Sequence, residues 1–270
     1  MNLMHTPKKH LGQNFLTDTH IQQKIIQACE LKADDVVVEI GPGQGVLTRL
    51  IAPHVKKLIC IETDRDLIEP LRSSLPARVD IIHADFLKWD FKQIQTDLVP
   101  CAPGTRSVQV KVIGNIPYYI STPIIERIIK NRSIISSVFL TVQLEFGQRL
   151  MAMPGGKDYG SLTCFVQYYA DTKIFFKIKN SCFNPAPKVD SCFLQLKMKS
   201  TLQEVDEEFL FTLIQTAFQQ RRKNIVNTLK GIVGREKLEN ELKALNIDPN
   251  ARPENLTLSN YINLCNRLML

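Results

Sequence analysis

The strongest constraint on the fold is an alternation of short apolar runs with amphipathic stretches between residues 18 and 153. The apolar runs are too short for ordinary helices, whereas apolar residues in the intervening stretches recur at helical spacing. The predicted strands are 36–40, 58–62, 79–83, 108–114 and 135–141, and the predicted helices are 18–31, 45–53, 64–75, 122–131 and 143–153. This alternation predicts an α/β fold, with a doubly wound, mostly parallel sheet covered on both faces.

The pattern changes after Gly155. Residues 162–170, 173–178 and 189–198 are predicted to form further strands, which would add antiparallel edge strands to the sheet. Four helices are predicted at 204–220, 222–233, 236–245 and 257–268. The expected organisation is a flexible arm over residues 1–17, the α/β domain over residues 18–200 and a small helical domain over residues 201–270.

Composition limits the class of protein. The 270 residues are 44% hydrophobic and 23% charged, which is typical of a globular chain. The seven cysteines are widely spaced and lack a C-x-x-C pair, so we expect neither a disulfide framework nor a metal site. No apolar run approaches the ~20 residues of a membrane span, and residues 1–10 lack the apolar region of a signal peptide. We therefore expect a cytoplasmic protein with no membrane partner.

The net charge of +7 is unevenly distributed along the chain. Residues 201–270 hold nine basic and nine acidic residues, so the whole excess lies in residues 1–200. A basic body favours a polyanionic partner, nucleic acid first. A solvated basic surface would have the same composition, and charge alone does not separate the two.

A glycine-rich turn, Gly41-Pro-Gly-Gln-Gly45, follows the first predicted strand and opens a helix. Glycines there permit positive φ and close approach of a ligand, although a purely structural turn would have the same pattern. Glu62 ends the second strand 21 residues after Gly41, where an acid can bind a ribose diol. Asp85 follows the third strand and could accept a hydrogen bond from an adenine amino group. Together these positions predict a site for an adenosine-containing cofactor.

Two cofactors present an adenosine, namely NAD and S-adenosylmethionine. NAD needs room for its pyrophosphate at the helix N-terminus, and Glu39, just before the glycines, would oppose that anion. The sulfonium and amino-acid end of S-adenosylmethionine tolerate nearby negative charge. The sequence therefore favours S-adenosylmethionine.

The fourth strand ends in Asn115-Ile116-Pro117-Tyr118. An exocyclic amino group on a nucleobase is a poor nucleophile, and two acceptors aimed at its hydrogens would direct its lone pair toward an incoming methyl group. The Asn115 side chain and the Ile116 carbonyl, extended because proline follows, could be those acceptors. Tyr118 offers a face on which the base could stack. These residues could also form an ordinary turn, but beside the glycines and acids they favour amine methylation.

Five segments together carry a family resemblance: residues 9–16 (KHLGQNFL), 39–45 (EIGPGQG), 115–118 (NIPY), 183–191 (FNPAPKVDS) and 220–223 (QRRK). They are similar to the motifs of the ribosomal RNA adenine N6-dimethyltransferases, above all the bacterial small-subunit enzymes linked to kasugamycin sensitivity. The resemblance covers nearly the whole chain.

The resemblance implies a class I S-adenosylmethionine-dependent methyltransferase domain, Rossmann-like, followed by a small α-helical domain. It implies dimethylation of two adjacent adenosines near the 3′ end of 16S rRNA, in the small subunit, during late 30S assembly. The partner would be 16S rRNA in the pre-30S subunit, and we expect a monomer that does not act on DNA.

Residue roles follow from the same resemblance. The catalytic residues would be Asn115, Pro117, Tyr118 and Phe183, with Phe183 flanking the target base opposite Tyr118. The cofactor contacts would be Asn14, Leu16, Gly41, Glu62, Asp85 and Asn115. The chain departs from the usual pattern at Asn184 and Ala186, where Thr or Ser and Pro are common.

Two basic clusters are candidate RNA contacts. Lys8 and Lys9 lie on the arm, where a solvated tail is the alternative, and Arg221, Arg222 and Lys223 are predicted to lie on a helix of the otherwise neutral domain. Either cluster could follow RNA phosphates.

Four other functions remain open at this stage. The related 23S rRNA methylases that confer macrolide resistance are disfavoured by the arm motif and by Pro-Lys-Val-Asp-Ser. A DNA adenine methylase would be expected to carry an added sequence-reading domain. A non-catalytic assembly factor would not need the intact Glu62, Asp85 and Asn115. An NAD dehydrogenase would need a hydride-transfer site that the sequence does not indicate.

Overall fold

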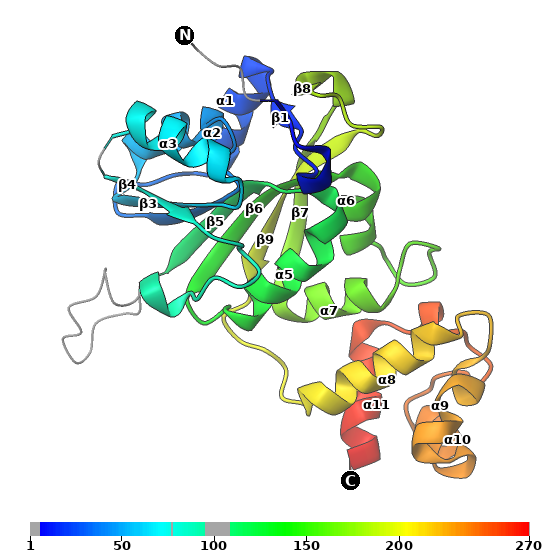
Figure 1. Ribbon diagram of the computed structural model, residues 1–270. Helices are drawn as coiled ribbons and strands as arrows, with labels where there is room; N and C mark the ends of the chain where they lie inside the picture. Colours follow the sequence, from blue (N-terminus) through cyan, green and yellow to red (C-terminus); the bar gives the residue numbers. More distant parts are fainter. Residues whose placement is uncertain (1–5, 77, 95–108, 270) are drawn as a thin grey trace, which may run out of the picture. The chain divides into compact units, whose positions relative to one another are not determined.

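The computed structural model describes residues 6–76, 78–94 and 109–269, which fall into two compact units (Figure 1). The first unit comprises residues 1–147 and 173–198, and the second comprises residues 148–172 and 199–270. Residues 148–172 therefore group with the helical unit, whereas the sequence assigned them to the α/β domain.

The first unit is built around a seven-stranded sheet in the order β4-β3-β2-β5-β6-β9-β7. The strands are β2 (Val36–Ile40), β3 (Lys57–Glu62), β4 (Val79–His83), β5 (Val110–Asn115), β6 (Ile135–Gln143), β7 (Ala170–Ile178) and β9 (Ser191–Met198). The neighbouring strands from β4 through β3, β2 and β5 to β6 pair in parallel, and β9 pairs antiparallel with β6. The predicted α/β fold with a mostly parallel sheet and an antiparallel edge is confirmed.

Helices cover both faces of this sheet (Figure 1). They are α1 (Thr19–Ala28), α2 (Val46–Ile51), α3 (Arg65–Ser74), α5 (Ser121–Lys130) and α6 (Leu144–Leu150). The first three bury apolar residues such as Ile25, Ile51 and Leu71 in one cluster with residues of β2 to β4. All five residues of β2 are buried, as a central parallel strand requires. The apolar runs in the sequence therefore correspond to strands whose two faces are both covered by helices.

The prediction of a strand at residues 162–170 is wrong, because this segment forms helix α7 (Ser161–Tyr169). It lacks a polar face that would have revealed its helical period, since Cys164, Val166 and Tyr168 are all buried. Its aromatic residues pack within the second unit, where the Phe165 and Phe211 rings lie 5.2 Å apart. A short run rich in aromatic residues is equally typical of a buried strand.

The second unit is helical, as predicted. Besides α7 it contains α8 (Glu207–Gln219), α9 (Ile225–Val233), α10 (Arg235–Ala244) and α11 (Leu258–Met269). Nowhere in the described ranges is there a helix long and apolar enough to cross a membrane.

The described part of the arm forms local structure and contacts the rest of the first unit, whereas its flexibility stays a prediction. It contains a 3-10 turn, η1 (Lys9–Leu11), and strand β1 (Phe15–Leu16), which pairs antiparallel with β8 (Phe183–Asn184). Lys8 contacts Asp64 and Asp66, and Gln13 donates a hydrogen bond to Asp64 at 2.8 Å. These contacts join the arm to the start of α3.

Candidate active site

A cavity of about 270 Å³ lies at the carboxyl ends of β2, β3 and β5. These strands are neighbours with parallel pairing, so the segments that follow them meet at one edge of the sheet. Eight of the predicted site residues line the cavity: Asn14, Leu16, Gly41, Glu62, Asp85, Asn115, Pro117 and Tyr118. The structure thus brings together all the predicted cofactor contacts and three of the four predicted catalytic residues.

The glycine turn forms the floor next to β2. Gly41 has φ +62°, and a Cβ built there would have no atom within 4 Å, so the glycine leaves the cavity open. Gly43 has φ +58°, and its Cβ would lie 2.9 Å from the ring of Phe15 on the arm. A larger residue at either position would be strained, and at Gly43 it would also displace the arm.

Backbone N–H groups hold the Glu62 carboxylate in place. It is only 6% exposed, and its two oxygens accept hydrogen bonds from the backbone N–H groups of Gly43 at 3.0 Å and Asp64 at 2.8 Å. Burial raises the pKa of Glu62, and these backbone hydrogen bonds oppose the shift. Each carboxylate oxygen can accept a second bond, so Glu62 is oriented to receive two hydroxyl groups from the cavity.

Glu39 lies beneath the turn and is 2% exposed. Burial raises its pKa to about 7, and the Cys60 thiol donates to its Oε2 at 3.4 Å. A carboxyl that is about half protonated near pH 7 repels a pyrophosphate less than a fully ionised one does. The argument against NAD that rested on Glu39 is therefore weakened, and the case for S-adenosylmethionine rests on the other residues of the site.

The raised pKa of Glu39 predicts that the first unit loses stability as the pH rises. The folded state keeps the proton up to about pH 7, whereas the unfolded carboxyl, with a pKa of 4.5, releases it earlier. Between those values the loss should be on the order of 3 kcal/mol, and Glu39→Gln should remove most of it. Urea unfolding at pH 5 and pH 8, followed by the fluorescence of the buried Trp89 in this unit, measures the difference. An equal pH dependence in both proteins would contradict the assignment.

Asp85 lies on the more open side of the cavity. Its side chain is 41% exposed, and its Oδ1 accepts a hydrogen bond from the Leu87 N–H at 2.9 Å. The cavity also contacts Phe86, which is buried, and Leu87. The Asp85 carboxylate can accept a hydrogen bond from the amino group of an adenine, and the apolar side chains beside it can contact the flat face of the same base.

The fourth strand end presents two acceptors. The Asn115 Nδ2 donates to the carbonyl of Asn14 at 2.8 Å, which turns its Oδ1 away from the arm. In the described part of the chain, neither this oxygen nor the Ile116 carbonyl accepts a hydrogen bond. Pro117 follows with extended backbone, φ −61° and ψ 130°. The arm residue Asn14 thus orients the amide that the sequence marked as catalytic, a link that local patterns did not reveal.

The Tyr118 ring is fixed by a partner that sequence reasoning missed. Its hydroxyl lies 2.6 Å from the Oγ of Ser191, a fully buried residue at the start of β9. Burial raises the pKa of Tyr118, so the phenol stays neutral. Ser191 belongs to the Pro-Lys-Val-Asp-Ser segment, and the presence of that motif was the only signal in the sequence.

Phe183 does not line the cavity, unlike the other three predicted catalytic residues. It is 4% exposed, pairs with Leu16 across β1 and β8, and belongs to the apolar cluster of the first unit rather than to the cavity lining. A ring buried in this way does not flank the cavity, so its base-flanking role remains a prediction that would require the ring to move.

The predicted RNA contacts also differ in their surroundings. The ammonium of Lys8 lies 2.7 Å from Asp66 and contacts Asp64, and these hydrogen bonds raise the pKa of Lys8. Its charge is therefore matched within the protein, whereas Lys9 is exposed and makes no ion pair among the described residues.

The basic cluster of the second unit lies in the turn between α8 and α9, not on a helix as the sequence predicted. Asn224 ends the turn by accepting a hydrogen bond from the Asn227 N–H, which starts α9 two residues after Lys223. Arg221 donates to the Lys157 carbonyl at 2.9 Å, and Arg222 and Lys223 are exposed.

The residues that line the cavity fit S-adenosylmethionine. The open side of Gly41, the doubly supported Glu62 carboxylate and Asp85 beside apolar side chains match an adenosine, with Asn14 and Leu16 from the arm closing the lining. Among the residues that the structure describes, no group of three or more His, Cys, Asp or Glu could hold a metal ion.

Comparison with known proteins adds the family. The family model described as ribosomal RNA adenine dimethylase matches residues 4–269. The protein named ribosomal RNA small subunit methyltransferase A in Moorella thermoacetica is 40% identical over 268 residues, 97% of this chain and 92% of that protein. The protein of that name in Clostridium acetobutylicum is 39% identical over 258 residues, 94% of this chain and 90% of that protein.

Two solved structures share the fold. The 23S rRNA methyltransferase ErmE has a TM-score of 0.71 at 25% identity, covering 95% of this chain and 100% of that chain. A dimethyladenosine transferase from Plasmodium falciparum has a TM-score of 0.73 at 24% identity, covering 93% and 95%. With the family model and relatives of about 40% identity spanning nearly the whole sequence, the chain belongs to the ribosomal RNA adenine dimethylase family and is an S-adenosylmethionine-dependent methyltransferase.

Proposed function

We propose that this protein dimethylates N6 of two adjacent adenosines near the 3′ end of 16S rRNA, within the small ribosomal subunit and late in its assembly. The observation that carries the proposal is the fourth strand end, where Asn115 is oriented by Asn14 in the same cavity as Glu62 and Asp85. Relatives named as small-subunit methyltransferases favour 16S rRNA over 23S rRNA as the substrate.

The proposed chemistry needs positioning more than proton transfer. When bound, S-adenosylmethionine supplies an electrophilic methyl group. The Asn115 Oδ1 and the Ile116 carbonyl accept the two hydrogens of the adenine amino group, which directs the nitrogen lone pair into the cavity. The Tyr118 ring, fixed by Ser191, supports the base by stacking. The carbon–nitrogen bond would form as the methyl–sulfur bond of the cofactor breaks, and the sulfur would leave with that bond's electron pair as a neutral thioether. The methylated nitrogen would then lose one proton to water, so no general base is needed.

The second methyl transfer needs the monomethylated nitrogen to turn within the site. The monomethylated nitrogen has one hydrogen left, which either acceptor can bind. The first methyl group takes the place of the second hydrogen. We propose that the protein acts as a monomer in the cytoplasm, and on RNA rather than DNA. The names of its relatives support an RNA substrate, because they are called ribosomal RNA methyltransferases.

The substrate is tested by transfer of radiolabelled methyl groups to three RNAs offered at equal concentration. These are 30S subunits lacking the modification, naked 16S rRNA and 50S subunits. The proposal expects label in 30S subunits above the other two. Label confined to 50S subunits would instead assign a 23S rRNA activity, and no label in any RNA despite cofactor binding would indicate a binding factor.

A further inference from the structure

Tyr119 is an aromatic ring that the fold itself does not use. It is 64% exposed, and among the described residues it is the only exposed large hydrophobic side chain that also lines the cavity. Its hydroxyl has no hydrogen-bond partner in the part of the chain that the structure describes. An exposed ring at the rim of a cavity is typical of a surface that covers a ligand rather than a core.

Tyr118 and Tyr119 follow each other in the 3-10 turn η3 (Tyr118–Ile120) but face different surroundings. Tyr118 is half-buried and fixed to Ser191, whereas Tyr119 remains exposed at the mouth. Two successive rings, one inside and one outside, suit two successive bases of a single-stranded RNA.

The arm holds the Tyr119 ring in place. A Cβ added to Gly12 would lie 3.1 Å from the ring Cε1 of Tyr119 and 3.2 Å from Pro117. The absence of a side chain at Gly12, together with its φ of +63°, therefore lets the arm backbone lie against the ring. The arm backbone therefore lies next to the Cδ1 and Cε1 atoms of the ring.

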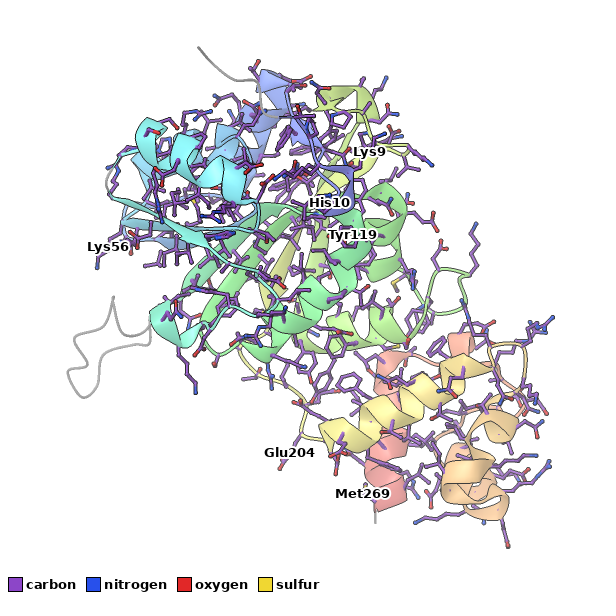
Figure 2. The ribbon with its side chains drawn as sticks, viewed as in Figure 1. Lys9, His10, Lys56, Tyr119, Glu204 and Met269 are labelled. Carbon is purple, nitrogen blue, oxygen red and sulfur yellow. The ribbon has the colours of Figure 1, made fainter. Side chains whose placement is uncertain are left out.

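Two polar side chains belong to the part of the arm that contacts this ring. Lys9 and His10 belong to the turn η1, whose last hydrogen bond joins the Gly12 N–H to the Lys9 carbonyl at 3.0 Å. Figure 2 shows Lys9, His10 and Tyr119 near one another on the first unit. The side chains of Lys9 and His10 are exposed, and neither makes an ion pair among the described residues, so both can contact a phosphate.

We propose that Tyr119, Lys9 and His10 form a second nucleotide subsite, in which Tyr119 stacks on the base next to the target adenosine and Lys9 and His10 bind the adjoining phosphate. The inference rests on the proposed function, because it requires an RNA substrate whose target base enters the cavity. It adds a reason why neighbouring adenosines would be engaged together: the base that waits for methylation is held at the mouth.

The test compares three variants of the ring under steady-state conditions with undermethylated 30S subunits. Tyr119→Phe keeps the ring, Tyr119→Leu keeps apolar bulk without it, and Tyr119→Ala removes both. Loss of one stacked base predicts a rise in KM for the subunit of roughly 5- to 150-fold for Tyr119→Ala. Tyr119→Leu should resemble Tyr119→Ala, and Tyr119→Phe should stay within about twofold of the wild-type KM.

Two further measurements separate stacking from a structural role. The Kd for S-adenosylmethionine reports whether the arm still lines the cavity, and it should change less than about threefold in Tyr119→Ala. Lys9→Ala should lower the salt dependence of RNA binding by about one unit of logarithmic slope. Lys56→Ala is the matched control, since Lys56 is exposed at the amino end of β3, the opposite sheet edge from the cavity (Figure 2).

The outcomes distinguish this inference from the proposed function. Wild-type activity on 30S subunits with an equal KM in Tyr119→Ala would overturn the subsite and leave the proposed function standing. A parallel rise in the cofactor Kd would also overturn it, because the ring would then act only through the arm. Absence of wild-type methyl transfer to any ribosomal RNA would overturn both.

Discussion

Replacing Asn115 by alanine is expected to lower kcat about 100- to 1,000-fold, the cost of removing one group that stabilises a transition state by hydrogen bonding. Asn115 lines the cavity, and its Oδ1 accepts no hydrogen bond among the described residues, so the variant loses an acceptor for the adenine amino group. The Kd for S-adenosylmethionine should change little, because the carboxylates that fit its adenosine remain. Single-turnover methyl transfer at saturating cofactor measures the effect.

A matched control for this variant is Asn131→Ala. Asn131 makes a bond of the same kind, from its Nδ2 to the Arg127 carbonyl at 2.8 Å, but it lies at the end of α5 and does not line the cavity. It should retain the wild-type kcat. If Asn115→Ala abolished cofactor binding but transferred methyl groups normally once saturated, the assigned role would be wrong.

Replacing Glu62 by alanine should have the opposite signature, with the Kd for S-adenosylmethionine raised at least about 100-fold and kcat at saturation nearly unchanged. Hydrogen bonds to a charged acceptor contribute about 1.5–3 kcal/mol each, and the variant loses an acceptor for two ribose hydroxyls. Isothermal titration measures the Kd directly. Asp85→Ala should weaken binding less, because the Asp85 side chain is 41% exposed.

The stability of the Glu62 variant must be followed separately. The substitution leaves the N–H groups of Gly43 and Asp64 without their acceptor, so the melting temperature without cofactor should fall. Glu62→Gln keeps one acceptor oxygen and should lie between alanine and wild type in both measurements. An unchanged Kd in Glu62→Ala would contradict the cofactor role even if the protein had become less stable.

The parallel sheet could be predicted from the sequence because its strands are short, apolar and bounded by turns. The predicted strands at 36–40 and 79–83 coincide with β2 (Val36–Ile40) and β4 (Val79–His83). The cavity residues could be predicted for the same reason, because strand ends of a parallel sheet meet at one edge. Segment 162–170 could not, because its apolar residues face all sides of α7 and show no period.

The contacts of the arm could not be predicted from local patterns. It depends on bonds between residues far apart in the chain, such as Lys8 with Asp64, 56 residues away, and Asn115 with Asn14, 101 residues away. The same holds for the 73-residue separation of Tyr118 and Ser191. Local sequence gave the residue types at the site, and the tertiary contacts that orient them became visible only in the folded chain.

The most direct test of the central claim is the chemical identity of the product. Undermethylated 30S subunits are incubated with the protein and radiolabelled S-adenosylmethionine, and the RNA is then digested to nucleosides and separated. The account predicts label in N6,N6-dimethyladenosine, with the N6-monomethyl nucleoside appearing first. Label only in a ribose-methylated or other nucleoside, or no label although the cofactor binds, would contradict it.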